Sequence, residues 1–166
     1  LPENIGEHQL CKIIEGDWLD TVNRAGLAGR GESVMLTNQI IIALHQMIEI
    51  LGAIAPLNLP DKIEIANRIK NYKHHALQFK NNLLKHALNE DGYFNSVFND
   101  SGKWLFSNKD PDGERRVYGP ANWFSIISGT TSHDVTESVL KEMEYLRCDA
   151  GYRLLWPPIG DPPIDN

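Results

Sequence analysis

The spacing of apolar residues along the chain predicts two pairs of helices. Residues 34–51 are apolar on nearly every helical face, which predicts a helix that is buried all round. This helix follows Ser33, a favourable N-cap residue, and Gly52 and Pro56 are expected to end it. Residues 59–88 repeat apolar residues every three or four positions with polar residues between them. This second pattern predicts an amphipathic outer helix with one solvent-facing side.

A different pattern separates this first pair from the second. Residues 93–107 carry aromatic and apolar residues on both sides of the sequence Asn-Asp-Ser-Gly at 99–102, which predicts a β-hairpin. A polar loop follows. Residues 120–127 then predict a short apolar helix that stops before Gly129, and Ser132 is expected to cap a last amphipathic helix. The fold class is therefore expected to be mainly α.

The first 32 residues have no such periodicity, so we expect a mostly irregular loop in which only residues 10–14 are compatible with a helical turn. Within it, Asp17 and Asp20 lie on either side of Trp18. A site that cleaves sugars needs such groups, because an indole offers a flat apolar face to a pyranose ring and a carboxyl group supplies a proton. We interpret this segment as an active-site loop.

Composition and charge exclude several classes of partner. The formal net charge is −6 and the pI is near 5.5, which argues against nucleic acid and anionic membranes, since both bind clustered Lys and Arg. We expect the apolar runs at 40–44 and 47–55 to be too short and too polar for a membrane span. Cys11 and Cys148 do not form a disulfide framework, and the six histidines have no zinc-binding spacing. We expect reduced thiols, a cytoplasmic location and no metal.

The order of the motifs resembles glycoside hydrolase family 94. Residues 16–20 (Gly-Asp-Trp-Leu-Asp) and 29–34 (Gly-Arg-Gly-Glu-Ser-Val) are similar to the GDWND and G-(K/R)-G-E-S-V sequences of that family. Further matches follow in the same order at residues 92–102, 122–129 and 154–158. The family contains the inverting cellobiose, cellodextrin, chitobiose and 1,2-β-oligoglucan phosphorylases and the phosphorylase-like region of cyclic β-1,2-glucan synthases.

This resemblance implies part of an (α/α)6 barrel with a small β-hairpin insertion. Proteins of the family are several times longer, with a β-sandwich domain before the barrel, so the chain is expected to be one slice of the barrel that does not turn over alone. We divide it into an active-site loop region (1–32), a first helical hairpin (33–90), a β-hairpin and loop (91–119), a second helical hairpin (120–150) and a tail (151–166).

The resemblance also places the catalytic acid at Asp20, the second aspartate of the GDWND-like motif. Inverting phosphorolysis needs one protein acid, because inorganic phosphate replaces the water that a hydrolase activates with a second carboxylate. Trp18 and Leu19 are expected to form the poorly solvated pocket that keeps this carboxyl group protonated. The competing interpretation of Asp20 is a loop aspartate that caps a turn.

The other candidate site residues have alternatives of their own. Trp18 is interpreted as a sugar platform, or else as a core residue. Asp17 either raises the pKa of the acid or forms an Asx-turn. Arg24 and Arg30 are candidates to approach phosphate or sugar hydroxyls, or else are solvated or paired with a carboxylate such as Glu32. Glu32 is interpreted as structural, fixing the loop onto the next helix.

Three functions remain open. The leading hypothesis is an inverting glycoside phosphorylase that cleaves a β-glucosidic bond with inorganic phosphate to give α-glucose 1-phosphate, without a cofactor. The alternatives are an inverting hydrolase, with Glu32, Asp17 or a residue outside this chain as the candidate base, and a non-catalytic carbohydrate-binding or structural module. The expected partners are a β-linked glucose oligosaccharide, phosphate and the rest of the parent polypeptide, and homodimer formation is left open. Leu19, Thr21 and Ala121 depart from the family pattern, and the family's phosphate-binding residues lie outside this chain.

Overall fold

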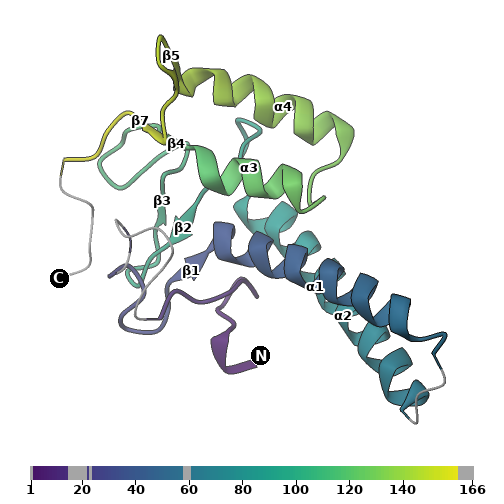
Figure 1. Ribbon diagram of the computed structural model, residues 1–166. Coiled ribbons are helices and arrows are strands. Elements are labelled where there is room, and N and C mark those ends of the chain that lie inside the picture. Colours follow the sequence, from purple (N-terminus) through teal and green to yellow (C-terminus); the bar gives the residue numbers. More distant parts are fainter. Residues whose placement is uncertain (1, 15–21, 23, 58–60, 161–166) are drawn as a thin grey trace.

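Helices make up most of the regular structure of this protein, whose computed structural model describes residues 2–14, 22, 24–57 and 61–160 (Figure 1). The prediction of a mainly α chain is confirmed. In the described residues the α-helices are α1 (Val34–Ile54), α2 (Lys62–Asn82), α3 (Gly119–Ile127) and α4 (His133–Met143). They are accompanied by the 3-10 segments η1 (Pro2–Asn4) and η4 (Glu144–Leu146) and by the π-helical segment η3 (Leu83–Ala87).

Short strands form small antiparallel sheets beside the helices. In the described residues they are β1 (Glu32–Ser33), β2 (Val97–Phe98), β3 (Trp104–Leu105), β4 (Val117–Tyr118), β5 (Arg147–Cys148), β6 (Gly151–Tyr152) and β7 (Leu155–Trp156). β1, β2 and β3 form one sheet in that order, while β4 pairs with β7 and β5 pairs with β6. The sequence indicated only a tail after residue 150, whereas β7 pairs with the strand that leads into α3.

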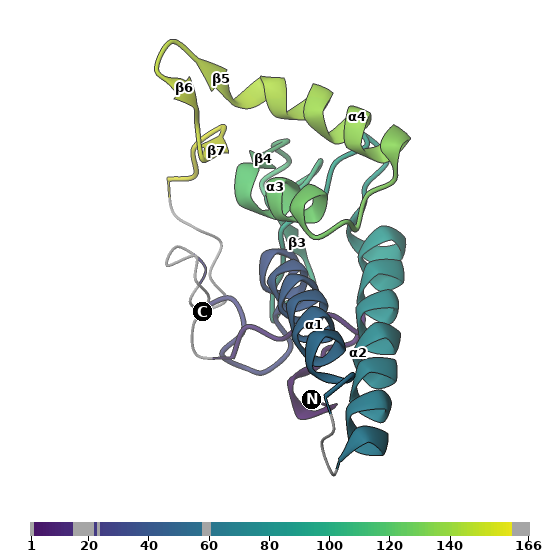
Figure 2. The same cartoon turned by 45° about the vertical axis from the view of Figure 1, so that its right-hand side comes forward.

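The first helix begins as expected but is not buried all round. The Ser33 hydroxyl accepts a hydrogen bond from the Leu36 N–H (3.1 Å), which confirms Ser33 as the N-cap. The helix then continues through Gly52, and in its second half Met47 is 40% and Ile50 is 55% exposed. Figures 1 and 2 show the reason, because the far ends of α1 and α2 extend together beyond the rest of the fold.

By length and composition, α1 is the one described helix that is apolar enough to cross a membrane. The expectation that the apolar runs are too short for a span therefore does not hold for this helix. Its first half contains the buried polar residues Thr37 and Asn38, which form hydrogen bonds inside the protein. These contacts are those of a core helix, and core helices pass the same test of length and composition.

The second helix has the amphipathic character that its spacing predicted. α2 runs antiparallel to α1 and lies beside it along its length (Figures 1 and 2). The buried positions share one helical face, with successive gaps of eleven, three, four and four residues through α2 and into η3, and they are Ile65, Ala76, Phe79, Leu83 and Ala87. The rest of the helix is exposed and mostly polar, although Ile63 and Leu77 are also exposed, so this helix covers one side of α1.

The predicted β-hairpin is confirmed by the pairing of β2 with β3, in which Val97 faces Leu105. The sequence did not predict that β1 joins this hairpin, with Ser33 opposite Val97. The suggested helical turn at residues 10–14 is wrong, because Cys11 and Lys12 form isolated β-bridges to Ile5 and Glu32. The start of the chain is thus tied to the same sheet that leads into α1.

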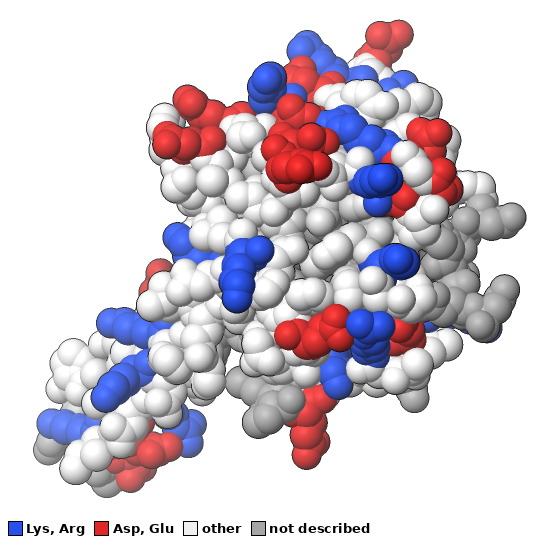
Figure 3. Space-filling view, turned by 180° about the vertical axis from the view of Figure 1, so that it is seen from behind, with Lys and Arg blue, Asp and Glu red and all other residues white. Residues whose placement is uncertain are grey.

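The second helical pair has the boundaries that the sequence indicated. α3 ends at Ile127 just before Gly129, and the Ser132 hydroxyl accepts a hydrogen bond from the Val135 N–H at the start of α4. α3 packs against the first half of α1, so the core lies between these helices, α2 and the hairpin. On the face seen in Figure 3, Lys and Arg side chains are scattered among Asp and Glu.

Candidate functional site

The predicted site residues Asp17, Trp18 and Asp20 lie outside the described residues. Arg24 is described and is exposed at the far end of that segment. The site is therefore built from the residues that flank the segment and from the elements that hold them. No described group of three or more His, Cys, Asp or Glu side chains is arranged to hold a metal ion.

The two ends of the segment that carries these residues meet at one place, which we call the loop base (Ile13, Ala25, Gly26 and Gly31). The Ile13 N–H donates a hydrogen bond to the Gly31 carbonyl oxygen (2.9 Å). A Cβ atom on Gly26 would lie 2.9 Å from the Ile13 Cβ, and one on Gly31 would lie 2.5 Å from the Gly26 Cα. The described chain therefore leaves the fold at Ile13 and returns to it at Ala25 and Gly26 beside the same point. Only glycine permits so close an approach.

Asp100, in the turn of the β2–β3 hairpin, binds the returning side of this loop. Its Oδ1 atom accepts hydrogen bonds from the Arg30 N–H (2.8 Å) and the Gly31 N–H (3.0 Å). Its Oδ2 atom accepts one from the Ala28 N–H (2.6 Å), and its own N–H donates to the Ala25 carbonyl oxygen (2.8 Å). A carboxylate that accepts several backbone N–H groups makes strong charge-assisted hydrogen bonds. The hairpin turn and the loop base are thereby joined into one unit.

Glu32 holds the other side of the loop from a fully buried position (0% exposed). Its Oε1 atom accepts hydrogen bonds from the N–H groups of His8 (3.0 Å) and Leu10 (3.1 Å), and Oε2 lies 2.5 Å from the His8 Nδ1. The carboxylate thus fixes residues 8–10 to β1, the strand that runs into α1. A buried carboxylate whose oxygens are already occupied is a poor candidate for the base of a hydrolase.

Arg30 does not pair with Glu32, as one alternative supposed. Its guanidinium forms two hydrogen bonds to the Glu7 carboxylate (3.0 and 3.1 Å) and lies over the Phe98 ring (5.3 Å to the centroid). Both charged side chains are nearly half exposed, so this pair contributes little to stability. The Arg30 guanidinium also lies close to Gly102, in the same hairpin turn as Asp100.

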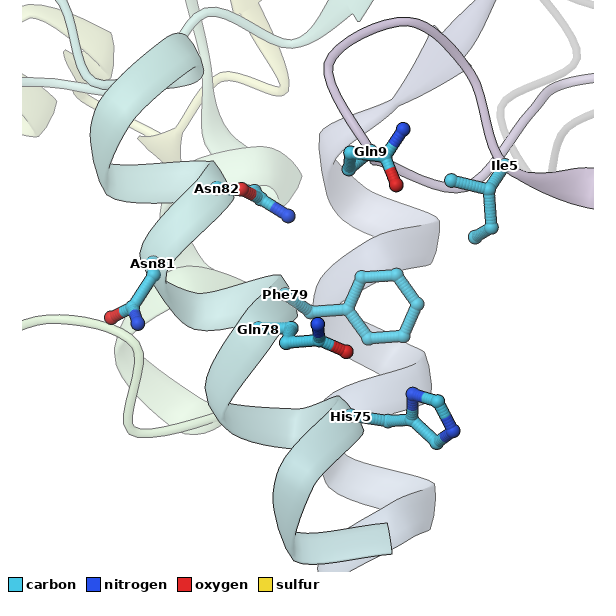
Figure 4. A pocket seen from close by; sticks show the side chains of 7 residues that line it. All are labelled: Ile5, Gln9, His75, Gln78, Phe79, Asn81 and Asn82. Carbon is cyan, nitrogen blue, oxygen red and sulfur yellow. The ribbon is translucent and has the colours of Figure 1, made fainter. Parts of the chain in front are cut away.

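A cavity of about 750 Å³ lies between the start of the chain and α2 (Figure 4). Its lining is mostly neutral amide side chains with an imidazole, an aromatic ring and an aliphatic side chain, and consists of Ile5, Gln9, His75, Gln78, Phe79, Asn81 and Asn82. In Figure 4 the Phe79 ring points toward the gap between Gln9 and His75. Of the predicted site residues Asp17, Trp18, Asp20 and Arg24, the structure describes Arg24, which does not line this cavity. A smaller hollow of about 240 Å³, which includes Lys12 and Arg30, lies beside the loop base.

The sequence did not assign a role to Asp100 or to His8. Asp100 was noted as part of the Asn-Asp-Ser-Gly turn and of the stretch 92–102 that carries the family resemblance, without a role of its own. An aspartate at the second position of such a turn is available to bind another loop. His8 had no spacing that marked it. Its role depends on a partner, Glu32, that lies 24 residues away in the chain.

Comparison with known proteins identifies the fold family of this arrangement. Residues 2–166 match the model of the glycosyl hydrolase 94 superfamily, catalytic domain. The chain belongs to this family. Family 94 relatives include a 3-O-beta-D-glucopyranosyl-beta-D-glucuronide phosphorylase from Paenibacillus borealis, 25% identical over 156 residues, or 93% of this chain and 19% of the relative. A solabiose phosphorylase from the same organism is 26% identical over 132 residues, or 76% of this chain and 15% of the relative.

The chain spans about a fifth or less of the length of these curated relatives. Membership of family 94 and the two phosphorylase relatives support a glycoside phosphorylase-like role in carbohydrate metabolism.

Several residues that carried the resemblance to family 94 have structural roles in the fold. Gly31 closes the loop base, Glu32 and Asp100 hold it, and the Asn122 amide binds the backbone N–H of Phe94 (2.8 Å).

Proposed function

We propose that this chain carries the acid-bearing loop of an inverting glycoside phosphorylase. The enzyme would cleave a β-glucosidic bond with inorganic phosphate and release α-glucose 1-phosphate. The observation that carries the proposal is the loop base, in which the Ile13–Gly31 hydrogen bond and the contacts of Asp100 fix both ends of the segment that contains Asp20. Such a loop suits a group that has to be held in one position relative to a substrate.

In the proposed reaction, Asp20 donates its proton to the oxygen between the two sugars. The bond from that oxygen to the anomeric carbon breaks, and a phosphate oxygen bonds to this carbon from the opposite face, so the configuration inverts. The acceptor sugar leaves as a neutral alcohol. Phosphate is a co-substrate and no cofactor takes part. Trp18 is proposed to bind the sugar ring, with Asp17 and Arg24 as further contacts.

The helical pairs α1–α2 and α3–α4 are proposed as two neighbouring sectors of an (α/α)6 barrel, completed by the rest of the polypeptide. The two relatives are named for phosphorolysis of a glucosyl glucuronide and of solabiose. The proposed substrate class is therefore a β-linked glucosyl disaccharide or oligosaccharide. A cytoplasmic location accords with the free thiols of Cys11 and Cys148.

Replacement of the proposed acid tests this function directly. In the intact protein, Asp20→Asn is expected to lower phosphorolysis of a β-glucosyl disaccharide by about 100-fold or more, because general acid catalysis typically contributes about 10²–10⁴-fold. The matched control is Asp149→Asn, the same change at an exposed turn position. Retention of more than a few per cent of activity in Asp20→Asn would remove this residue as the acid.

Phosphate dependence separates this function from an inverting hydrolase. A phosphorylase cleaves the disaccharide only when phosphate is present, and α-glucose 1-phosphate accumulates in proportion to cleavage. A hydrolase releases free glucose at the same rate without phosphate. Equal cleavage with and without phosphate would replace the proposal with the hydrolase.

The amide-lined cavity favours a second candidate function, the binding of an oligosaccharide. Neutral amides and an imidazole both donate to and accept from sugar hydroxyl groups, and Phe79 offers an apolar face. Among the described residues, no hydrogen bond occupies the side-chain amides of Gln78 and Asn82. The volume of about 750 Å³ lies within the range of ligand pockets.

Calorimetric titration with a β-linked glucose oligosaccharide tests this second candidate. The double variant Gln78→Ala/Asn82→Ala is expected to weaken binding about tenfold, because two hydrogen-bonding groups are lost. Asn71→Ala, on the same helix but outside the cavity lining, serves as the control. Unchanged binding in the double variant would remove the cavity as a saccharide site.

A further inference from the structure

We infer that His8 and His86 form a pH switch for the amide-lined cavity, in which a proton on His86 releases one wall of the cavity and weakens ligand binding. The inference rests on the second candidate function, saccharide binding in that cavity, and concerns its regulation. The wall that is released carries Ile5 and Gln9, and we call it the wall turn (residues 5–10). The opposite wall is α2, as Figure 4 shows.

The wall turn is held in place by its contacts and not by the preference of its backbone. Gln9 has φ +60°, a conformation that residues other than glycine rarely adopt. Such a conformation persists only where the surrounding structure holds it. Within the turn, the Gly6 N–H donates to the Leu10 carbonyl oxygen (2.9 Å), and the Gln9 N–H donates to the Gly6 carbonyl oxygen (3.0 Å). A change in the contacts around the turn is therefore expected to move Gln9.

Glu32 of β1 anchors the wall turn at His8 and Leu10. Its carboxylate accepts hydrogen bonds from both backbone N–H groups, and its Oε2 atom also lies 2.5 Å from the His8 Nδ1. The packing against Gly6 is equally close, since a Cβ atom there would lie 2.3 Å from the Glu32 Oε1. One carboxylate neutralises one imidazolium, so Glu32 compensates a positive charge on His8.

His86 lies on another side of the His8 ring. It belongs to η3, four residues after Asn82 of the cavity lining, and the centroids of the two imidazole rings are 5.0 Å apart. The His8 ring also packs against Phe98 (4.4 Å between centroids) and Trp104 (5.4 Å) of the β2–β3 hairpin. Both imidazoles are partly buried, so water screens charges on them only in part.

The groups around the pair disfavour a proton on His86. Burial lowers the pKa of His86 below the usual histidine value of 6.5, and the neighbouring His8 and Lys85 lower it further. Glu32 acts in the opposite direction. Glu7, which also senses the charge of His8, is already paired with a guanidinium. In the described part of the chain, no carboxylate forms an ion pair with His86.

The direction of the pH effect follows from this lowered pKa. The arrangement with a neutral His86 is fully stable above about pH 6.5 and is lost as the pH falls below it, because separation of the rings favours uptake of the proton. His8 belongs to the wall turn, whereas His86 follows directly on α2. Separation therefore moves the two walls of the cavity apart, and a ligand held between Gln9 and α2 loses the contacts on one side.

Calorimetric titration of the intact protein with a β-linked glucose oligosaccharide at pH 7.5 and pH 5.5 tests the switch. The dissociation constant of the wild type is expected to rise about tenfold at the lower pH, as is usual for coupled sites. His86→Gln has no titrating group at this position, so its dissociation constant is expected to change less than about twofold and to match the wild type at the higher pH. A rise that persists in His86→Gln, or that is absent from the wild type, overturns the inference.

Two other histidines provide the controls. His75 lines the cavity itself, so His75→Gln is expected to weaken binding at both pH values while the rise at low pH remains. His133→Gln, at an exposed position of α4, is expected to bind as the wild type does at both pH values. Loss of the rise in either variant would assign it to a histidine other than His86 and overturn the inference.

Hydrogen exchange separates failure of this inference from failure of the saccharide function, because it needs no ligand. The backbone N–H groups of residues 8 and 10, which donate to Glu32, are expected to lose protection at pH 5.5 by about tenfold beyond the intrinsic effect of pH. In His86→Gln this loss is expected to disappear. If both results are found and no saccharide binds at either pH, the second candidate function is overturned and the pH response of the wall turn is retained. Unchanged protection in the wild type overturns the switch.

Discussion

At the scale of single residues, Glu32 and Asp100 show how one carboxylate holds together segments that are far apart in the chain. Both bind backbone N–H groups far away in the chain, Glu32 at residues 8 and 10 and Asp100 at residues 28, 30 and 31. A sequence motif can single out such a carboxylate residue. It does not identify the backbone groups that the carboxylate binds, because every residue except proline offers a backbone N–H.

Cys11 is a second residue whose behaviour follows from its burial. Burial raises the pKa of its thiol from 9.0 to about 11, against a smaller lowering by the hydrogen bond with Thr37. A thiol whose pKa is raised on folding stabilises the folded state fully below the unfolded value, near pH 9. This contribution is lost as the pH rises toward about 11, because the unfolded chain releases the proton first.

This linkage predicts a specific pH dependence of stability. Between pH 8 and pH 10.5, the free energy of unfolding of the wild type is expected to fall by about 2 kcal/mol more than that of Cys11→Ala. Other groups that titrate in this range, such as Tyr93, affect both proteins and cancel in the difference. The measurement is urea denaturation at the two pH values. Parallel curves for the two proteins would contradict the assigned pKa.

At the scale of elements, the helix boundaries show where local rules are sufficient. Gly129 ends α3 as expected, since it has φ +72° in the position after the last turn. Gly52 was also expected to end a helix, but it lies inside α1. A lone glycine lowers helix propensity by only about 1 kcal/mol, and packing of α1 against α2 exceeds that cost.

These two glycines predict opposite effects of the same substitution. A Cβ atom at either position would meet nothing within 4 Å, so only the backbone conformation differs. Gly52→Ala is expected to stabilise the protein by about 0.5–1 kcal/mol, because alanine is the better helix former. Gly129→Ala is expected to destabilise it by about 1 kcal/mol, because of its positive φ. Thermal and urea denaturation measure both, and effects of the same sign would be inconsistent with the structure.

At the scale of the whole molecule, a buried polar network joins the two helical pairs. Asn38 of α1 is fully buried, and its amide nitrogen donates to the Ser125 hydroxyl of α3 (2.9 Å). Its amide oxygen accepts from the hydroxyls of Ser128 (2.7 Å) and Thr130 (2.8 Å), just beyond α3. Lys80 of α2 adds a hydrogen bond to the Gly129 carbonyl oxygen (2.9 Å). The helix pairs are thus held in a defined arrangement.

Loss of this network is expected to lower the stability of the folded protein. Asn38→Ala should lower the free energy of unfolding by about 3 kcal/mol, because it removes the buried hydrogen bonds that its amide forms with Ser125, Ser128 and Thr130. Gln46→Ala, at an exposed position of the same helix, should change it by less than about 0.5 kcal/mol. Urea denaturation of the two variants gives the comparison. A change below 1 kcal/mol in Asn38→Ala would show that the network contributes little.

The sequence by itself determined the helical pairs, the hairpin, the N-caps at Ser33 and Ser132, and the family. These follow from local rules, since periodicity, capping and turn chemistry act within a few residues. The tertiary structure alone decided which face of α1 is exposed, that β1 joins the hairpin, and that Asp100 and Glu32 hold the loop base. These features depend on contacts between residues far apart in the chain, and no local pattern encodes such a partner.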